Sequence, residues 1–172
     1  MSDLVVRPAR PDELERVGRI TVAAYDADGY LVRPDGGYDD VYASSLADAA
    51  GRAASSVVLA AVEAGEVVGT VTWCPPGSGL RQQAVHDHQG ELRMLAVDPA
   101  VRGRGVGAAL LDACLDSARA QGLTEVVLCS LPEMRAAHRL YAARGFERRP
   151  DLDWSPLPDV LLWGFGLRLT AG

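Results

Sequence analysis

The chain has 172 residues, 48% of them apolar, so we expect one domain of ordinary size with a sizeable core over residues 1–172. Its net charge of −6 argues against a general nucleic-acid surface, because such surfaces are normally basic. No apolar run approaches a membrane span and no leader precedes a cleavage site, so we predict a cytoplasmic protein with no membrane partner.

Strand-like and helix-like segments mix along the chain. In chain order the first half predicts a strand at Leu4–Pro8, a helix opened by Pro11, a loop at Asp26–Tyr42, a short helix around Val41–Ala50, and strands at Ser56–Glu63 and Glu66–Cys74. In the second half we expect a loop at Pro75–Gly90, a strand at Glu91–Val97, a helix ended by Gly122 and a strand at Thr124–Cys129. They are followed by a helix over Glu133–Arg144, a loop at Pro150–Pro158 and a strand at Val160–Leu169. The mixture predicts an α/β or α+β domain with a mixed sheet.

A glycine-rich segment joins the strand that ends at Val97 to the helix that follows it. Glycines before a helix N-terminus suit a diphosphate, because free N–H groups and the helix dipole attract anions. Gly103, Gly105 and Ala108 also match the dinucleotide fingerprint, and a turn used only for packing is a third alternative. A P-loop is excluded, because its lysine is missing: all 17 basic residues are arginine, and the chain also lacks asparagine.

The residues around these glycines narrow the choice. Arg102-x-x-Gly105-x-Gly107, preceded by Val97-x-Pro99, resembles the acetyl-CoA signature of the GNAT superfamily of N-acetyltransferases. Further similar segments are Val6–Ala9 with Pro11–Leu14, the hairpin Val57–Cys74, and Ala137–Phe146. The resemblance implies a mixed, mostly antiparallel twisted sheet of six to seven strands flanked by about four helices.

The resemblance also implies acetyl-CoA as cosubstrate, with no metal. The strand residues that would offer backbone groups to the pantetheine arm are Leu95, Ala96 and Val97. The residues whose backbone would hold the pyrophosphate are Arg102, Gly103, Arg104, Gly105, Val106, Gly107 and Ala108. Met134 stands where the family often has an asparagine that contacts pantetheine, so that contact is missing from the pattern.

Two residues match catalytic positions of the family. Tyr141 would protonate or hydrogen-bond the departing thiolate, and its alternative is a core residue on an apolar helix face. Glu91 would act as general base, through a water, on the incoming ammonium. Regular alternation places Glu91, Arg93, Leu95 and Val97 on one face of the strand, and the alternative for Glu91 is a solvated residue paired with Arg93.

Other reactive side chains receive structural interpretations. Cys114 and Cys129 are expected as small buried apolar residues, and three cysteines without metal-type spacing indicate a reducing compartment. We expect His86 and His88 in a solvated loop, and His138 on a helix surface or at the cofactor edge.

The expected reaction is direct transfer of acetyl, in a ternary complex, to a primary amine of a small molecule or peptide. The acceptor side would be built by Tyr25–Tyr42, Pro75–Gly90 and Arg149–Pro158, the first of which gathers acids and tyrosines that suit a cationic amine. A homodimer is compatible with this assignment. The alternatives are an acyl-CoA sensor of the same fold and, from the glycine fingerprint alone, a nicotinamide-dependent oxidoreductase.

Overall fold

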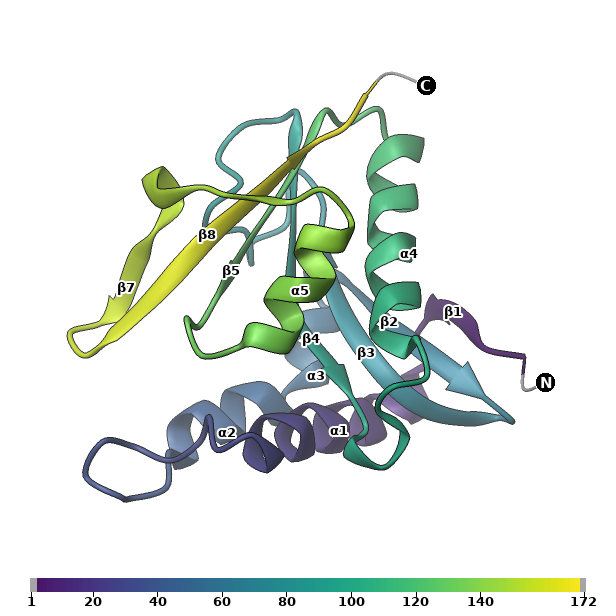
Figure 1. The fold of residues 1–172 in the computed structure, drawn as a ribbon. Coiled ribbons are helices and arrows are strands. Elements are labelled where there is room, and N and C mark those ends of the chain that lie inside the picture. Colours follow the sequence, from purple (N-terminus) through teal and green to yellow (C-terminus); the bar gives the residue numbers. More distant parts are fainter. Residues whose placement is uncertain (1–2, 171–172) are drawn as a thin grey trace. The chain divides into compact units, whose positions relative to one another are not determined.

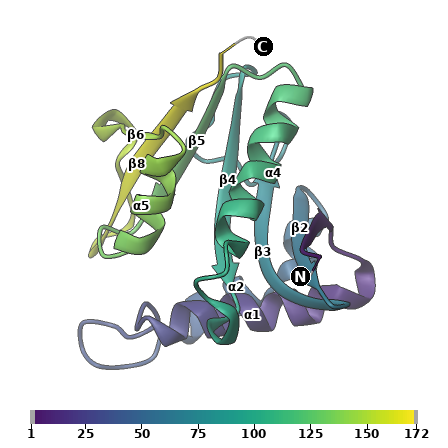
Figure 2. The same ribbon diagram turned by 45° about the vertical axis from the view of Figure 1, so that its right-hand side comes forward.

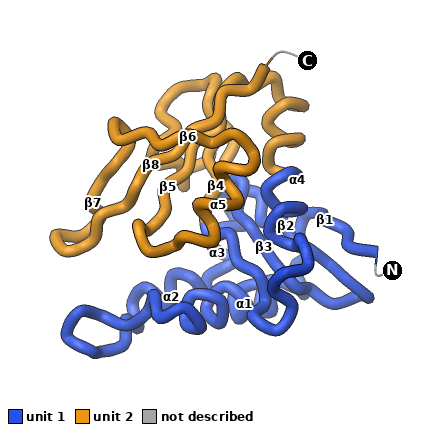
Figure 3. The backbone as a smooth tube through the Cα atoms, viewed as in Figure 1, with its two compact units in different colours: residues 1–73, 94–113 blue, residues 74–93, 114–172 orange. Residues whose placement is uncertain are grey.

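The computed structural model describes residues 3–170, which divide into two compact units (Figure 3). The first unit holds the described residues up to Trp73 together with Met94–Ala113, and the second holds Cys74–Arg93 together with the described residues from Cys114 onward. Two strands and one long helix pass from one unit into the other, after Trp73, Arg93 and Ala113 respectively. That residues 1–172 act as one acetyltransferase domain therefore stays a prediction.

The first unit contains an antiparallel strand group and the N-terminal helices (Figure 1). Its strands are β1 (Val5–Pro8), β2 (Val57–Glu63) and β3 (Glu66–Cys74, whose last residue belongs to the second unit), with the second half of β4 (Gln89–Val97). Its helices are α1 (Leu14–Ala27), α2 (Asp40–Ala47) and α3 (Ala49–Ala53), with the first half of α4 (Val106–Ala120). Short 3-10 turns at Pro11–Glu13 and Pro99–Val101 precede α1 and the glycine segment.

The second unit contains the C-terminal strands and the helix α5 (Arg135–Ala143). Its strands are the first half of β4, then β5 (Glu125–Ser130), β6 (Glu147–Arg148), β7 (Trp154–Leu157) and β8 (Val160–Arg168), with a 3-10 turn at Pro150–Leu152. In both ribbon views α5 lies beside β8 (Figures 1 and 2), and Tyr141 of α5 contacts Phe165 of β8 at 5.9 Å between ring centroids.

The strands pair in the order β1-β2-β3-β4-β5-β8-β6, with β7 beside β8. The pairs β1·β2, β2·β3, β5·β8, β6·β8 and β7·β8 are antiparallel, and β4·β5 is parallel. The predicted mixed, mostly antiparallel sheet is thereby confirmed.

Two details of the prediction were wrong. Residues 3–170 form eight strands rather than six to seven, because the expected loop at Pro150–Pro158 contains β7, and two residues at Glu147–Arg148 pair with β8. The helix expected around Val41–Ala50 is two helices, because Asp48 leaves helical geometry and accepts a hydrogen bond from the Gly51 N–H at 2.9 Å. A side-chain acceptor at this position caps a new helix.

The core of the first unit explains why its sequence pattern was readable. Apolar residues of α1, α3, β2, β3 and β4 are buried together: Val17, Ile20, Ala24, Ala49, Val58, Ala60, Val67 and Ala96. Gly69 of β3 lets the first turn of α4 approach, because a Cβ there would lie 2.7 Å from Val106 Cγ1 and 3.1 Å from Leu110 Cδ1. The start of α4 is thereby fixed against the sheet.

No helix among residues 3–170 has both the length and the apolar character needed to cross a bilayer.

Candidate active site

The glycine turn lies in the first unit, between the end of β4 and the start of α4. Gly103 and Gly105 have φ of 81° and 82°, and a Cβ on either would meet no atom within 4 Å. Because L side chains rarely adopt this conformation, glycine is required by the backbone even though space is open. The Gly105 carbonyl accepts the first helical hydrogen bond from Ala109 N–H at 3.0 Å. The N–H groups just after Gly105 therefore lack helical partners and can receive an anion.

Three ion pairs hold this turn in place. Arg102 donates to both carboxylate oxygens of Asp28 at 2.8 and 3.0 Å, and to the Ala24 carbonyl at 3.1 Å. Arg104 pairs with Glu63 at 2.9 Å. Before the turn, Asp98 pairs with Arg16 of α1 at 2.7 Å. Both arginine side chains of the turn therefore contact carboxylates, while Arg102 and Arg104 remain 42% and 58% exposed.

The strand that precedes the turn is irregular. Met94 has φ of 56°, in the left-handed region, so the regular alternation of β4 breaks there. The expectation that Glu91, Arg93, Leu95 and Val97 share one face was therefore wrong, because it assumed an uninterrupted pleat. The parallel pairing of β4 with β5 covers Gln89–Glu91, which stops short of the residues expected to offer free backbone groups, Leu95, Ala96 and Val97.

Glu91 lies in the second unit, and its side chain is buried, with 2% exposure. Its Oε2 accepts from the Gln82 N–H at 2.6 Å and its Oε1 from the Gln83 N–H at 2.9 Å. Burial raises the pKa of Glu91, against the lowering effect of these two hydrogen bonds and of Arg93 and Arg81. The burial excludes the alternative of a solvated Glu91. Because its pKa is raised, the carboxyl takes up a proton at a higher pH than an ordinary glutamate does.

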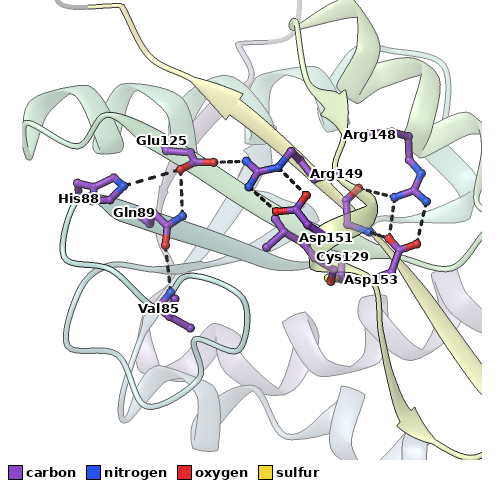
Figure 4. Close-up of polar contacts among 11 residues, drawn as sticks. Val85, His88, Gln89, Glu125, Cys129, Arg148, Arg149, Asp151 and Asp153 are labelled. Atoms are coloured by element: carbon purple, nitrogen blue, oxygen red, sulfur yellow. Dashed lines mark hydrogen bonds and ion pairs between the residues drawn. The ribbon is translucent and has the colours of Figure 1, made fainter.

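A network of ion pairs fixes the segment after β6 (Figure 4). Arg149 donates to Glu125 at 2.6 Å and to Asp151 at 2.9 and 2.7 Å. Arg148 donates to both oxygens of Asp153 at 2.7 and 2.9 Å. The Asp153 carboxylate also accepts from the Gly164 N–H at 2.7 Å, which ties the segment to β8. The turn at Pro150–Leu152 and the start of β7 are therefore held from both sides.

Cys129 lies half-buried on β5 in the same unit. Burial raises the pKa of its thiol to about 12, with Glu91 as the next cause, and the thiol donates to the Leu152 carbonyl at 3.7 Å. A thiol that stays protonated at neutral pH is a poor nucleophile. This agrees with direct transfer rather than an acyl-cysteine. Burial likewise raises the pKa of Cys114, which is fully buried as expected.

Tyr141 is buried on α5 at 5% exposure, between Phe146 and Phe165 at 5.8 and 5.9 Å. Burial raises the pKa of its hydroxyl, and nearby Cys114 raises it further. A phenol held in its neutral form can donate a proton or a hydrogen bond but cannot serve as a base near neutral pH. Both the core packing and the proton-donor role expected from the sequence are compatible with this environment.

The residues near Met134 form a small polar group. The hydroxyl of Ser130, which is 5% exposed, lies 3.1 Å from His138 Nε2 and 3.5 Å from Met134 Sδ. His138 stacks on Trp163 at 5.9 Å. Ser130 was missed by sequence reasoning, although a polar residue ending a buried strand could have drawn attention to it.

The two loop histidines, His86 and His88, are exposed and stack on each other at 5.4 Å. Over residues 3–170 no group of three or more metal-ligating side chains comes together. The absence of a metal remains a prediction.

The structure therefore gathers the expected site residues in two places. The pantetheine and pyrophosphate residues, Leu95–Val97 and Arg102–Ala108, lie in the first unit, whereas Glu91 and Tyr141 lie in the second. Gln82 and Gln83, which bind the Glu91 carboxylate, were not found from the sequence, because no local pattern marks a loop amide as the partner of a later side chain.

Comparison with known proteins identifies the family. The sequence profile of the Acetyltransferase (GNAT) family matches residues 20–146, well over half of the chain. The chain therefore belongs to the GNAT family of acetyltransferases, as the glycine signature indicated, and the dinucleotide-binding alternative is discarded.

Among curated relatives, mycothiol acetyltransferase of Beutenbergia cavernae is 46% identical over 57 residues, 33% of this chain and 19% of that protein. N-acetyltransferase 8 of Rattus norvegicus is 34% identical over 102 residues, 58% of this chain and 41% of that protein. The chain therefore matches less than half of the length of either relative.

Among solved structures, a GNAT-family acetyltransferase from Staphylococcus aureus Mu50 is similar with a TM-score of 0.73 and 14% identity, over 98% of this chain and 100% of that one. An acetyltransferase from Salmonella typhimurium, solved with its cofactor acetyl-CoA, has a TM-score of 0.67 and 22% identity over 98% and 95% of the two chains. At these identities the two structures support the fold alone.

Proposed function

We propose that this chain is an acetyl-CoA-dependent N-acetyltransferase, acting as one domain on a primary amine of a small molecule or peptide. The single observation that carries the proposal is the glycine turn. Gly103 and Gly105 open the backbone at the N-terminus of α4, while Arg102 and Arg104 are engaged by carboxylates. Backbone N–H groups at a helix start suit a pyrophosphate, and the similar Salmonella structure was solved with acetyl-CoA.

Glu91 is assigned the role of base. The amine reaches the site as an ammonium and must lose a proton before its nitrogen can attack. The raised pKa of Glu91 brings its proton affinity nearer to that of an amine, and a bridging water would carry the proton. Two backbone hydrogen bonds orient the carboxylate of Glu91 when it is ionised.

Tyr141 is assigned the role of proton donor. When the amine nitrogen bonds to the thioester carbon, the carbon–sulfur bond breaks and a thiolate departs. The neutral hydroxyl of Tyr141 supplies a proton to that sulfur, and the proton lost by the new amide nitrogen restores the hydroxyl. The backbone of Leu95, Ala96 and Val97 is assigned to the pantetheine arm.

Release of free CoA, measured across a panel of polyamines, aminoglycosides, amino acids and peptide N-termini, tests the proposal. We expect turnover with at least one class of amine, together with acetyl-CoA binding measured by calorimetry in the absence of amine. Tight acetyl-CoA binding without turnover on any amine would contradict the enzyme assignment and favour the acyl-CoA sensor. Binding of NAD in place of CoA would contradict the cofactor assignment.

A further inference from the structure

We propose that Gln83 is a positioning residue for the Glu91 carboxylate. Its backbone contacts that carboxylate, and its side chain contacts Leu152 and Trp154. The inference rests on the proposed function, in which Glu91 is the base. All of these residues lie in the second unit. They connect two of the segments expected from the sequence to form the acceptor side, 75–90 and 149–158.

The backbone of Gln83 makes the first connection. Its N–H donates to Glu91 Oε1 at 2.9 Å, next to the Gln82 N–H on Oε2 at 2.6 Å. Both carboxylate oxygens are therefore held by consecutive N–H groups of one loop. Hydrogen bonds to the ionised form stabilise it, so the position of this loop controls how readily Glu91 deprotonates.

The side chain of Gln83 makes the second connection. When the oxygen and nitrogen of the Gln83 amide are assigned so that each faces a complementary partner, Nε2 donates to the Leu152 carbonyl at 3.1 Å and Oε1 accepts from Trp154 Nε1 at 3.1 Å. The segment that supplies these partners is itself hydrogen-bonded on both sides, since Asp153 is bound by Arg148 and by the Gly164 N–H. Gln83 thus ties the loop that holds Glu91 to this bonded segment.

Other charged and titratable groups also act on Glu91. Arg81 of the loop and Arg93 of β4 lower its pKa, and the thiol of Cys129 on β5 is close enough for the two groups to influence each other. None of these groups is altered when the Gln83 side chain is changed. A change in the Glu91 pKa on substitution of Gln83 therefore reports the hydrogen bonds from the loop.

The test is a carboxyl ¹³C NMR titration of Glu91 in the full chain, with its resonance assigned by its loss in Glu91→Gln. Gln83→Met keeps the backbone N–H and the size of the side chain but removes both side-chain hydrogen bonds. We expect the pKa of Glu91 to rise by about 0.5 to 1 unit, because the loosened loop stabilises the carboxylate less. The acid limb of kcat/KM should move to higher pH by the same amount.

Trp154→Phe removes the indole donor and keeps the ring, and it is expected to shift the pKa in the same direction by a smaller amount. Trp154→Phe also provides the test if Gln83→Met fails to fold. Gln121→Met makes the same chemical change at an exposed glutamine in the turn just after α4, so it is the matched control. A Glu91 pKa in Gln83→Met and Trp154→Phe equal to that of Gln121→Met would overturn the inference.

The two proposals fail in different ways. If no amine is acetylated but the pKa shift is present, the proposed function is wrong and Gln83 still positions the carboxylate. If turnover is normal and neither the pKa nor the acid limb moves, the proposed function survives and the role of Gln83 is refuted.

Discussion

The glycine turn at 102–108 and the Glu91 carboxylate are held by different kinds of interaction. The backbone conformation of the turn comes from its own residues, since Gly103 and Gly105 supply left-handed backbone and the helix start supplies free N–H groups. Ion pairs to Asp28 and Glu63 then hold the turn against other segments. Glu91 takes its environment from other segments, since its oxygens are bound by loop amides eight and nine residues earlier. That loop is in turn tied to Leu152 and Trp154.

This difference teaches which substitutions should matter in each region. In the turn, we expect residues other than the glycines to be replaceable, because the proposed binding groups are backbone N–H groups and the arginines face carboxylates. Around Glu91, side chains remote in sequence should change the pKa of the carboxyl without touching it.

The largest effect is expected in the turn itself. Gly105→Glu places a side chain and a negative charge at the left-handed residue that opens α4. We expect acetyl-CoA affinity, measured by calorimetry, to fall by at least about 100-fold, because both strain and charge oppose an anion there. Gly122→Glu is the control: its φ is 70° and its surroundings are equally open, so it carries the same backbone strain at the far end of α4. Equal loss of affinity in both variants would sink the assignment.

A smaller effect is expected at Tyr141. Tyr141→Phe keeps the aromatic packing on Phe146 and Phe165 and removes the hydroxyl. We expect kcat to fall by about 100-fold with acetyl-CoA affinity unchanged, because proton donation to the leaving group is lost. Full turnover in a correctly folded Tyr141→Phe would leave this residue with a packing role only.

The smallest effect is expected at the ion pair between Arg102 and Asp28, whose side chains are 42% and 38% exposed. Arg102→Gln and Asp28→Asn should each weaken acetyl-CoA binding about two- to fivefold, since exposed pairs contribute little. Arg119→Gln, at an exposed pair within α4, is the control. A loss of 100-fold in Arg102→Gln alone would mean that the guanidinium binds phosphate directly, contrary to the backbone account.

Most of the fold could be predicted because its signals are local. The helical spacing of the apolar residues Leu14, Val17, Ile20 and Ala24 indicates α1. Two strand-like runs separated only by Ala64 and Gly65 indicate the β2–β3 hairpin. The missed strands β6 and β7 are two and four residues long, and each forms by pairing with β8. Strands this short carry too few residues to show an alternating pattern, so only the partner strand reveals them.

The same distinction applies to the candidate site. The glycines of the turn could be predicted, whereas the pairing of Arg102 with Asp28 joins residues 74 positions apart. The burial of Glu91 was also unpredictable, because its sequence neighbours gave no sign that a loop would cover it. The break at Met94 was missed because positive φ at a non-glycine residue is set by the surrounding structure rather than by the residue type.

The pH dependence of kcat/KM in wild type and Glu91→Gln tests the central claim most directly. Burial raises the pKa of Glu91 above its ordinary value of 4.5, so the base is neutralised, and activity lost, as pH falls through that raised pKa. We expect this acid limb in wild type, and in Glu91→Gln a plateau at least about 100-fold lower without the limb. The same limb and plateau in both proteins would contradict Glu91 as the base.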